Sequence, residues 1–361
     1  MASQPLHLAW SNPVQIHWGA GCFQSIALDG PVVVLADRAA LTPDAEAALA
    51  LRLGGNSRHW SWFRGGLASV ELAQTLCAEL WPVLAACPDA TLLAIGGGST
   101  LDLAKVLRYR LEQGEPAAHW RANSVPAEHV RHPLWLVPTT AGTGSEVTRW
   151  ATLWDTGRAE PVKLSWAPAL GHAERAWIDP ELSLSCPLRQ SRDCALDTLA
   201  HALESLWNRN ANPVTEALAL EAARIVIANL PELMPGAEGL HVRCQLSRAS
   251  LLAGLAMSHT QTALAHALSY GLTLRESLPH GEACAVWLPM VWELAVGASD
   301  ACDAVLGRVF GVPAAAGTRC LRQWLLAQGI AARDLRDTPD GRETLEREMR
   351  SVRGRNFIGA A

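Results

Sequence analysis

The chain has 361 residues, about twice the ~150 residues of a typical domain, so we expect two domains. Hydrophobic residues make up 49% and charged residues 18% of it, which is ordinary globular usage and excludes a disordered or fibrous protein. With 30 basic and 35 acidic residues the net charge is −5, and the absence of a long basic block argues against a nucleic-acid-binding protein.

The beginning of the chain and its cysteines indicate a cellular compartment. Residues 1–14 (MASQPLHLAWSNPV) lack a charged region followed by an apolar one, so no signal peptide is expected. The most continuous apolar stretch, residues 283–292, is too short to span a bilayer. Nine scattered cysteines without a CxxC pair disfavour both a disulfide framework and a cysteine zinc site. We therefore expect a soluble cytoplasmic protein that does not bind membranes.

The first half of the chain alternates strand-like and helix-like segments. Short apolar runs at 32–35 (VVVL), 92–95 (LLAI) and 134–137 (LWLV) are typical of buried strands in a parallel sheet. Between them lie segments with helical spacing of apolar residues, such as 70–80. This alternation predicts a Rossmann-like α/β domain.

The pattern becomes helical after Asp179-Pro180. Residues 196–290 show helical spacing and few β-branched runs. Asn212 followed by Pro213 predicts the start of a helix, and Pro231 predicts its end. We therefore expect an α/β domain over residues 1–185 and an all-α domain over residues 186–361.

A run of glycines follows the second predicted strand. Gly96, Gly97 and Gly98 lead through Ser99 and Thr100 into a predicted helix. Backbone amides at such a helix start can approach a phosphate closely, and the helix dipole favours its negative charge. The run is not GxGxxG, so the ordinary dinucleotide fingerprint is absent. By itself, the run is also compatible with a tight turn.

A second polar loop follows the third predicted strand. Residues 138–146 (PTTAGTGSE) carry four hydroxyl groups and two glycines. Ligands bind at the carboxyl ends of strands in open α/β sheets, so two such loops favour a nucleotide site. Asp37, after the first predicted strand, has a carboxylate that can accept hydrogen bonds from an adenosine ribose, although a solvated loop residue is an equal alternative.

Candidate metal ligands lie in the helical half. Asp197 and His201 are four residues apart, so they share one helix face. His266 lies in an apolar helical segment, and His280 follows fourteen residues later. Three imidazoles and one carboxylate suit Fe²⁺ or Zn²⁺. For each residue taken alone, a hydrogen-bonded histidine or an ordinary polar pair is an equally good interpretation.

Several motifs together resemble one family. GGGSTLDLAK (96–105), PTTAGTGSEVT (138–148), DTLAH (197–201) and AHALSYGLTLRESLPHG (265–281) are similar to motifs of the iron-dependent (group III) alcohol dehydrogenase family. The similarity runs in order from about residue 12 to residue 289. It implies a dehydroquinate synthase-like fold, a Rossmann-like domain followed by a helical domain, with the active site between them, and it suggests a homodimer.

The resemblance also implies roles for individual residues. The implied ligands of one divalent metal, Fe²⁺ or Zn²⁺, are Asp197, His201, His266 and His280. The implied contacts of the cofactor are Gly97, Gly98 and Ser99 at the pyrophosphate, Thr139, Thr140 and Thr143 at the nicotinamide, Lys163 at a ribose, and Asp102 within the same motif. Asp37 matches the position that favours NAD(H) over NADP(H), so NAD(H) is the expected cofactor.

The segments around residues 204–208, 250–257 and 265–273 are most similar to the phosphonoacetaldehyde reductase branch of that family. The implied reaction is reduction of a small aldehyde bearing a phosphonate. The candidate residues for the substrate are Arg149, His259 and Arg275. Alternatives are a general short-chain alcohol dehydrogenase, a carbon–oxygen lyase similar to dehydroquinate synthase, and a non-catalytic binding protein.

Overall fold

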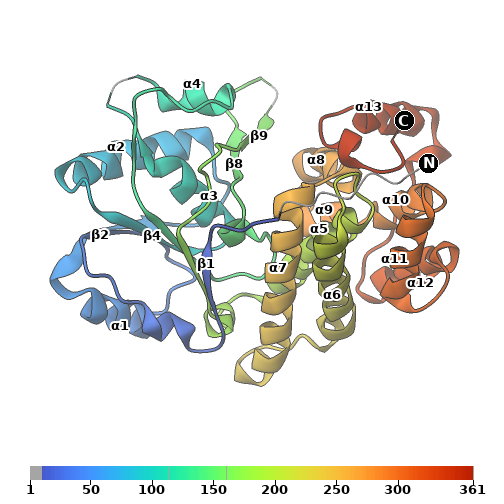
Figure 1. Cartoon of the computed structure of the whole chain (residues 1–361), viewed down its shortest axis with the longest axis horizontal. Coiled ribbons are helices and arrows are strands. Elements are labelled where there is room, and N and C mark those ends of the chain that lie inside the picture. Colours follow the sequence, from blue (N-terminus) through green and yellow to red (C-terminus); the bar gives the residue numbers. More distant parts are fainter. Residues whose placement is uncertain (1–9, 113, 160, 361) are drawn as a thin grey trace, which may run out of the picture.

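The computed structural model describes residues 10–112, 114–159 and 161–360. The expectation that no signal peptide is present concerns residues 1–14, of which 1–9 lie outside the described residues. Figure 1 shows an α/β part beside a part made of helices, as the sequence predicts. Among the described residues, no helix combines the length and the apolar character needed to cross a membrane.

The α/β part is built on a six-stranded sheet in the order β1-β10-β7-β4-β2-β3, with every neighbouring pair parallel. Two short antiparallel pairs, β5 with β6 and β8 with β9, lie outside it. The strands and helices of this part are β1 (Gln15–Trp18), β2 (Val32–Asp37), α1 (Pro43–Leu53), β3 (Ser57–Phe63), α2 (Val70–Ala86), β4 (Thr91–Gly96), α3 (Gly98–Leu107), β5 (Tyr109–Arg110), α4 (Pro116–Arg121), β6 (Val130–Arg131), β7 (Leu134–Pro138), β8 (Ala151–Asp155), β9 (Val162–Trp166) and β10 (Arg175–Ile178).

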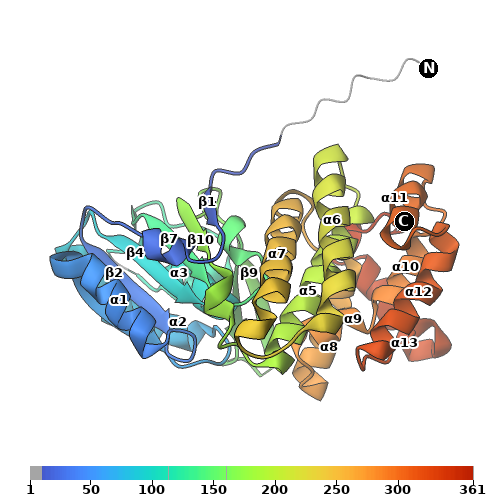
Figure 2. The same cartoon turned by 90° about the horizontal axis from the view of Figure 1, so that it is seen from below.

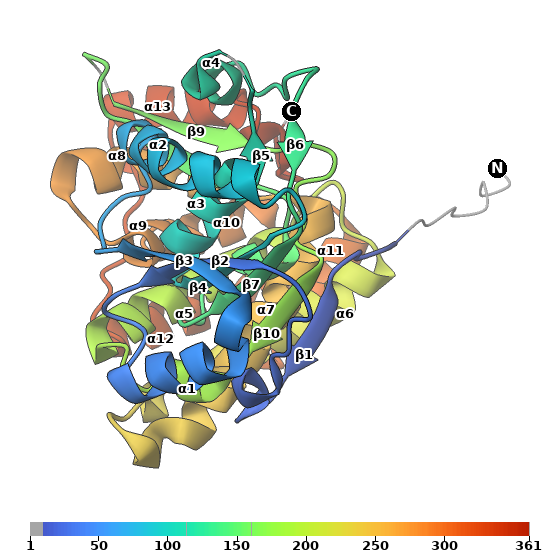
Figure 3. The same cartoon turned by 90° about the vertical axis from the view of Figure 1, so that its left-hand side faces the viewer.

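The three predicted strands are confirmed as β2, β4 and β7, the central strands of the sheet. They are continuous apolar runs because helices cover both faces of the sheet and leave no solvated side. Figure 3 shows α1 on one face and α2 with α3 on the other. The predicted helix over 70–80 is confirmed as the first part of α2.

The strand order reverses between β2 and β4. From β2 the chain passes to β3 at one edge and returns to β4 on the other side of β2. The register places the ends of three strands at one edge, since Ala36 pairs with Ile95 and Gly96 pairs with Pro138. A doubly wound sheet binds ligands at such a reversal, at the carboxyl ends of its strands. Asp37 is the last residue of β2, the glycine run begins at the end of β4, and the second polar loop begins at the end of β7.

The second part is helical throughout the described residues. Helices α5, α6 and α7 pack side by side next to the sheet, as Figure 2 shows, and the remaining helices lie beyond them. These helices are α5 (Leu188–Leu206), α6 (Pro213–Asn229), α7 (Leu240–Thr260), α8 (Leu264–Glu276), α9 (His280–Ala285), α10 (Leu288–Ala295), α11 (Asp300–Phe310), α12 (Ala314–Ala327) and α13 (Pro339–Met349).

The predicted start and end of one helix are confirmed in α6. The Asn212 side chain accepts hydrogen bonds from the amides of Val214 and Thr215, and the Thr215 hydroxyl accepts one from the Asn212 amide. This capping box satisfies backbone donors that have no partner within the helix. The helix ends at Asn229, just before Pro231. The predicted domain boundary at residue 185 falls just before α5 and stays a prediction.

Candidate functional site

Helix α5 carries three polar side chains on one face. Asp197, His201 and Glu204 lie at positions i, i+4 and i+7, which one face of an α-helix brings together. A stripe of fully buried leucines faces the core of the helical part at Leu196, Leu199, Leu203 and Leu206. Because this stripe fixes the rotation of α5, the three polar side chains face α8 and α9.

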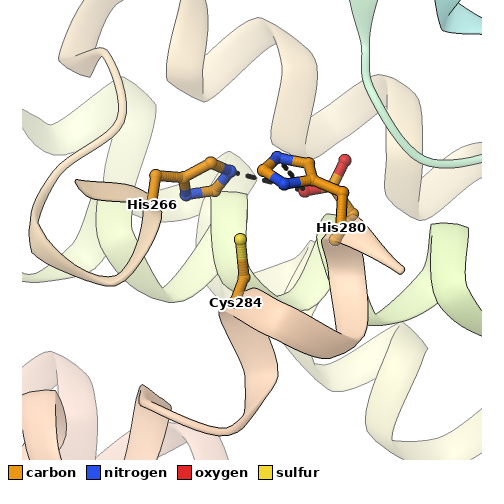
Figure 4. Close-up of side chains that lie close together, drawn as sticks. His266, His280 and Cys284 are labelled. Carbon is orange, nitrogen blue, oxygen red and sulfur yellow. Dashed lines mark ion pairs between the residues drawn. The ribbon is translucent and has the colours of Figure 1, made fainter. Parts of the chain in front are cut away.

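Three histidines converge on the Asp197 carboxylate. The Nε2 atoms of His201, His266 and His280 lie 3.6, 3.4 and 3.9 Å from Asp197 Oδ1. Two ligands at the usual 2.0–2.2 Å from a tetrahedral ion lie about 3.4 Å apart, so each of these three spacings suits a pair of ligands on one cation. The donor atoms that all lie within 4.8 Å of one another are those of Asp197, His266, His280 and Cys284, and His201 is not in this group. Figure 4 shows the His266 and His280 side chains pointing toward each other from α8 and α9.

Unpaired polar atoms support the fit to a cation. Asp197 Oδ1 and His266 Nε2 are buried and have no hydrogen-bond partner among the described residues. Buried polar atoms are rarely left unpaired in folded proteins, because the lost hydration is not repaid. A divalent cation bound between these atoms would satisfy them. The donor set therefore fits the predicted metal.

The titration behaviour of the cluster suits metal binding. Burial raises the pKa of the Asp197 carboxyl, but the nearby charges of His201, His280 and His266 outweigh this and hold the pKa below its usual range. Burial lowers the pKa of His201 to about 4, and it also lowers the pKa of His280. At neutral pH Asp197 is therefore a carboxylate, and His201 and His280 are neutral imidazoles, the forms that ligate metals. Burial lowers the pKa of His266, but the neighbouring Cys284 and Glu204 outweigh this and raise it, so a metal would displace a proton from His266.

Sequence reasoning missed Glu204, which orients His266. The carboxylate is fully buried and lies 2.7 Å from His266 Nδ1. It also accepts hydrogen bonds from the amides of Ala263, Ala265 and His266, so it caps the N-terminus of α8. Because Nδ1–H donates to Glu204, the lone pair of Nε2 faces Asp197. The spacing of seven residues from Asp197, which places both side chains on one helix face, is the sequence signal that could have identified Glu204.

Cys284 is a second residue that sequence reasoning missed. Its thiol and the donor atoms of Asp197, His266 and His280 all lie within 4.8 Å of one another. Cys284 is fully buried and lies one helical turn after His280, and its side chain points toward the two histidines (Figure 4). The spacing of four residues from His280, which places both side chains on one helix face, is the sequence signal that could have identified Cys284.

Gly281 allows α9 to approach α5. A Cβ at this position would lie 2.0 Å from the backbone oxygen of Asp193 and 2.8 Å from the nitrogen of Asp197. The Asp193 carboxylate accepts a hydrogen bond from the Glu282 amide in the first turn of α9. The two helices are therefore held at backbone contact, and this contact brings His280 within reach of Asp197.

The two polar loops of the α/β part touch each other at the edge of the sheet. A Cβ on Gly98 would lie 2.6 Å from Thr143 Cγ2, and one on Gly97 would lie 3.4 Å from the Thr140 side chain. A Cβ on Gly96 would lie 2.9 Å from Asp37 Cβ. Since a side chain at position 96 or 98 would overlap with these neighbours, the two loops and Asp37 are packed closely together at this edge.

The remaining predicted cofactor residues lie on or near the same loops. Ser99 is in the first turn of α3, and Thr139 is buried at the end of β7, where its amide donates to the Gly96 carbonyl. Both carboxylate oxygens of Asp102 accept hydrogen bonds within the protein, from the Ser145 hydroxyl at 2.6 Å and the Thr152 amide at 2.8 Å. Asp102 therefore holds the second loop against α3.

The second loop also contacts the helix that carries the metal ligands. A Cβ on Gly142 would lie 2.8 Å from Cys194 Cβ in α5, and the Thr198 hydroxyl donates to the Gly142 carbonyl at 3.3 Å. Thr198 is the residue after Asp197. The sheet edge and the donor cluster are therefore adjacent across the junction of the two parts.

The three predicted substrate residues make contacts with other groups. Arg149 packs over the ring of its neighbour Trp150, and Arg275 is exposed and lies over Gly271 of its own helix. His259 stacks on Trp10 and lies 3.0 Å from the Ser11 carbonyl. Among the described residues, no hydrogen bond or ion pair joins any of the three to the donor cluster.

A Rossmann-like sheet domain joined to a helical part with a buried three-histidine, one-carboxylate cluster defines a class of nucleotide- and metal-dependent proteins. Two family models match the chain, "Iron-containing alcohol dehydrogenase" over residues 59–179 and "Fe-containing alcohol dehydrogenase family, C-terminal" over residues 192–320. The chain belongs to the iron-containing alcohol dehydrogenase family.

Curated relatives give the same family. The chain is 32% identical to a phosphonoacetaldehyde reductase of Streptomyces viridochromogenes over 68% of its length and 66% of the relative's. It is 34% identical to a choline dehydrogenase of Bacillus subtilis over 56% of its length and 50% of the relative's. The chain spans about half the length or less of most of the curated relatives it matches.

Solved structures share the fold over nearly the whole chain. A sulfoacetaldehyde reductase of Bifidobacterium kashiwanohense, solved in complex with NAD⁺, superposes with a TM-score of 0.84 at 24% identity and covers 98% of this chain and 95% of its own. An iron-containing alcohol dehydrogenase of Thermotoga maritima superposes with a TM-score of 0.77 at 24% identity, covering 97% and 94% of the two chains. The predicted fold class is confirmed.

Proposed function

We propose that the protein is an oxidoreductase that uses a nicotinamide cofactor and a divalent metal to interconvert small aldehydes and alcohols. The observation that carries this proposal is the convergence of three imidazole Nε2 atoms on Asp197 Oδ1, next to a glycine-lined sheet edge. A polarising ion and a hydride carrier at adjacent sites are what carbonyl reduction requires.

The metal site is assigned to Asp197, His201, His266 and His280. A divalent ion held there supplies Lewis acidity to a substrate carbonyl or alkoxide. Nitrogen and oxygen donors suit both Fe²⁺ and Zn²⁺. Asp197, His201 and His266 are buried, whereas the His280 side chain is 29% exposed; the burial of the first three strengthens the charge interactions between them.

The cofactor site is assigned to the sheet edge. Backbone amides of Gly97, Gly98 and Ser99 at the start of α3 can bind a pyrophosphate. The Asp37 carboxylate can accept hydrogen bonds from a ribose and repels a 2′-phosphate, which favours NAD(H) over NADP(H). Thr139, Thr140 and Thr143 lie on the loop that leads from this edge toward α5.

Phosphonoacetaldehyde, reduced to 2-hydroxyethylphosphonate, is the proposed substrate. The 32% identity to a phosphonoacetaldehyde reductase over 68% of the chain supports this choice. A sulfoacetaldehyde reductase of Bilophila wadsworthia is also 32% identical, over 55% of the chain, so a sulfonate is the nearest competitor. Division into domains at residue 185 and assembly as a homodimer remain predictions of the sequence.

The test is a panel of aldehydes with NADH and NADPH. We expect consumption of NADH that stops after chelation and returns with Fe²⁺ or Zn²⁺. The variant His280→Ala should lose both activity and bound metal, whereas His241→Ala, a change in α7 outside the cluster, should lose neither. Turnover of a substrate without net change in NADH would instead indicate a carbon–oxygen lyase. If His266→Ala and His280→Ala retain activity and metal content, the site assignment is wrong.

A further inference from the structure

Two cationic side chains approach one aromatic ring beside the donor cluster. Lys163 Nζ, from β9 of the α/β part, lies 4.6 Å from the centre of the Tyr270 ring. Arg353 Cζ, from the segment after α13, lies 5.7 Å from the same centre. Tyr270 belongs to α8, one helical turn after His266. Three distant segments of the chain therefore meet at Tyr270.

Neither cation is neutralised by an ion pair within the described part of the chain. The Arg353 guanidinium donates to the Thr262 hydroxyl, and this neutral group leaves its charge unbalanced. Carboxylates pair with many of the chain's other arginines, for example Arg333 with Glu276 and Arg336 with Asp334. Two cations that form no ion pair among the described residues and lie at one ring favour an anionic ligand.

The cationic pair lies directly beside a proposed metal ligand. The Tyr270 ring stacks on the His280 ring, with an interplanar angle of 15° and 6.5 Å between their centres. The Tyr270 hydroxyl is buried and has no hydrogen-bond partner among the described residues. A ligand at this place could receive a hydrogen bond from it.

We propose that Arg353, Lys163 and the Tyr270 hydroxyl bind the anionic end of a short aldehyde whose carbonyl faces the donor cluster. This inference rests on the proposed function and names its substrate class, which is an aldehyde that carries a tetrahedral oxyanion, a phosphonate or a sulfonate. Arg353 is the specific element, because the planar guanidinium can donate to two oxygens of such a group at once.

This proposal adds a residue to the arginines that the sequence suggested. Arg149 contacts Trp150 and Arg275 contacts Gly271, whereas Arg353 reaches Tyr270 from the C-terminal segment, beyond the motifs of the family. Lys163 belongs to the α/β part, and the family resemblance also implies a contact of this residue with the cofactor. Arg353 approaches only from the helical side and is the residue to test.

The experiment compares kcat/KM for phosphonoacetaldehyde and sulfoacetaldehyde with that for uncharged butyraldehyde. For Arg353→Ala we expect the ratio of charged to uncharged substrate to fall by about 10- to 100-fold, the size of one or two charge-assisted hydrogen bonds. Arg353→Lys should show a smaller fall in this ratio than Arg353→Ala. Lysine keeps the positive charge but cannot donate two parallel hydrogen bonds as the guanidinium does. Arg355→Ala, at an exposed residue two positions away, is the matched control and should leave the ratio unchanged.

A binding measurement separates this inference from the proposed function. Calorimetric titration of the metal-loaded protein with ethylphosphonate and with ethanesulfonate should show binding that weakens in Arg353→Ala and not in Arg355→Ala. Thermal melting of each variant checks that it is folded. If no aldehyde is reduced, the proposed function fails, and Arg353-dependent binding of the anion still supports the site. A ratio unchanged by Arg353→Ala, or anion binding independent of Arg353, overturns the inference.

Discussion

The buried Glu204 carboxylate connects the helical fold to the proposed chemistry. It accepts three backbone amide hydrogen bonds at the start of α8 and holds the His266 ring through Nδ1. Burial raises its pKa, but the charge of His266 and these hydrogen bonds outweigh that effect and lower it. One residue therefore both starts a helix and fixes the direction of a metal ligand.

We predict that Glu204→Gln weakens metal binding by about 10- to 100-fold, the usual cost of losing the carboxylate partner of a metal-ligating histidine. The glutamine amide is similar in size to the carboxylate but lacks the negative charge that makes the His266 Nε2 atom a stronger metal ligand. Competition with a chromophoric chelator measures the affinity. The control Glu221→Gln changes an exposed ion pair with Arg248 and should have no effect. Equal affinities for Glu204→Gln and the unmodified protein would contradict this role.

At the scale of elements, a glycine contact joins α7 to the second polar loop. Gly144 has a φ of +60°, and a Cβ on Gly254 of α7 would lie 2.8 Å from Gly144 Cα and 2.9 Å from Val147 Cγ2. Backbone meets backbone here, so the loop that leads toward the donor cluster is pressed against the helical part. The contact allows almost no side chain at either position.

We predict that Gly254→Ala destabilises the protein by about 1–3 kcal/mol, the usual cost of overpacking. The added methyl group must push α7 away from the loop, so affinity for NADH should fall as well. Urea unfolding and fluorescence titration with NADH measure the two effects. Gly30→Ala, where the new Cβ has no neighbour within 4 Å, is the control. An unchanged stability of Gly254→Ala would show that the contact is not tight.

A second element-scale feature is an ion-pair cluster that ties α4 to the β8–β9 pair. Asp155 at the end of β8 has no solvent-exposed side-chain surface and accepts hydrogen bonds from Arg121 at 2.8 Å and from Arg158 at 2.6 Å. These bonds, the one from Arg121 first, lower the pKa of Asp155 to about 2. The cluster holds the end of the β8–β9 pair at which Asp155 pairs with Val162, and Lys163 is the next residue of β9.

This shift predicts a pH dependence of stability. Because the folded pKa of Asp155 lies below its unfolded value of about 4, its contribution is fully present above pH ~4 and is lost as the pH falls toward 2. The difference in unfolding free energy between the unmodified protein and Asp155→Asn should therefore shrink between pH 4 and pH 2. Urea titrations of both proteins across this range measure it, and a difference that stays constant would contradict the prediction.

At the scale of the whole molecule, the proposed metal links helices that are far apart in sequence. Asp197 and His201 come from α5, His266 from α8 and His280 from α9. Without an ion these helices are held by leucine packing, the Glu204 cap and the Gly281 contact. Binding of an ion to the folded chain alone adds to that stability by mass action.

We predict that Fe²⁺ or Zn²⁺ raises the melting temperature of the chelated protein by several degrees. A free ion concentration about 100 times Kd stabilises the folded state by about 2.7 kcal/mol, and roughly 2–4 °C accompany each kcal/mol in a domain of 150–250 residues. Differential scanning calorimetry measures the shift, with Mg²⁺ as the control ion. His280→Ala should show no shift, and a full shift in that variant would rule out His280 as a ligand.

The sequence determined much of this protein through local patterns. Continuous apolar runs identified β2, β4 and β7, because buried parallel strands need apolar residues on both faces. The Asn212-Pro213 pair located the start of α6, because capping depends on adjacent residues. Spacing of four residues placed Asp197 and His201 on one helix face, and the motifs identified the family.

The tertiary structure decided which of these side chains meet. The sequence assigned no role to four residues whose importance comes from contacts between segments far apart in the chain. They are Glu204, Cys284, Tyr270 and Arg353. Arg149 and Arg275 stand beside the motifs in sequence, and the contacts that the structure shows for them are with Trp150 and Gly271; their role toward the substrate stays a prediction. Helix periodicity fixes the face on which a side chain lies, whereas its partners depend on how α5, α8, α9 and the C-terminal segment pack, and that packing is set by the whole core.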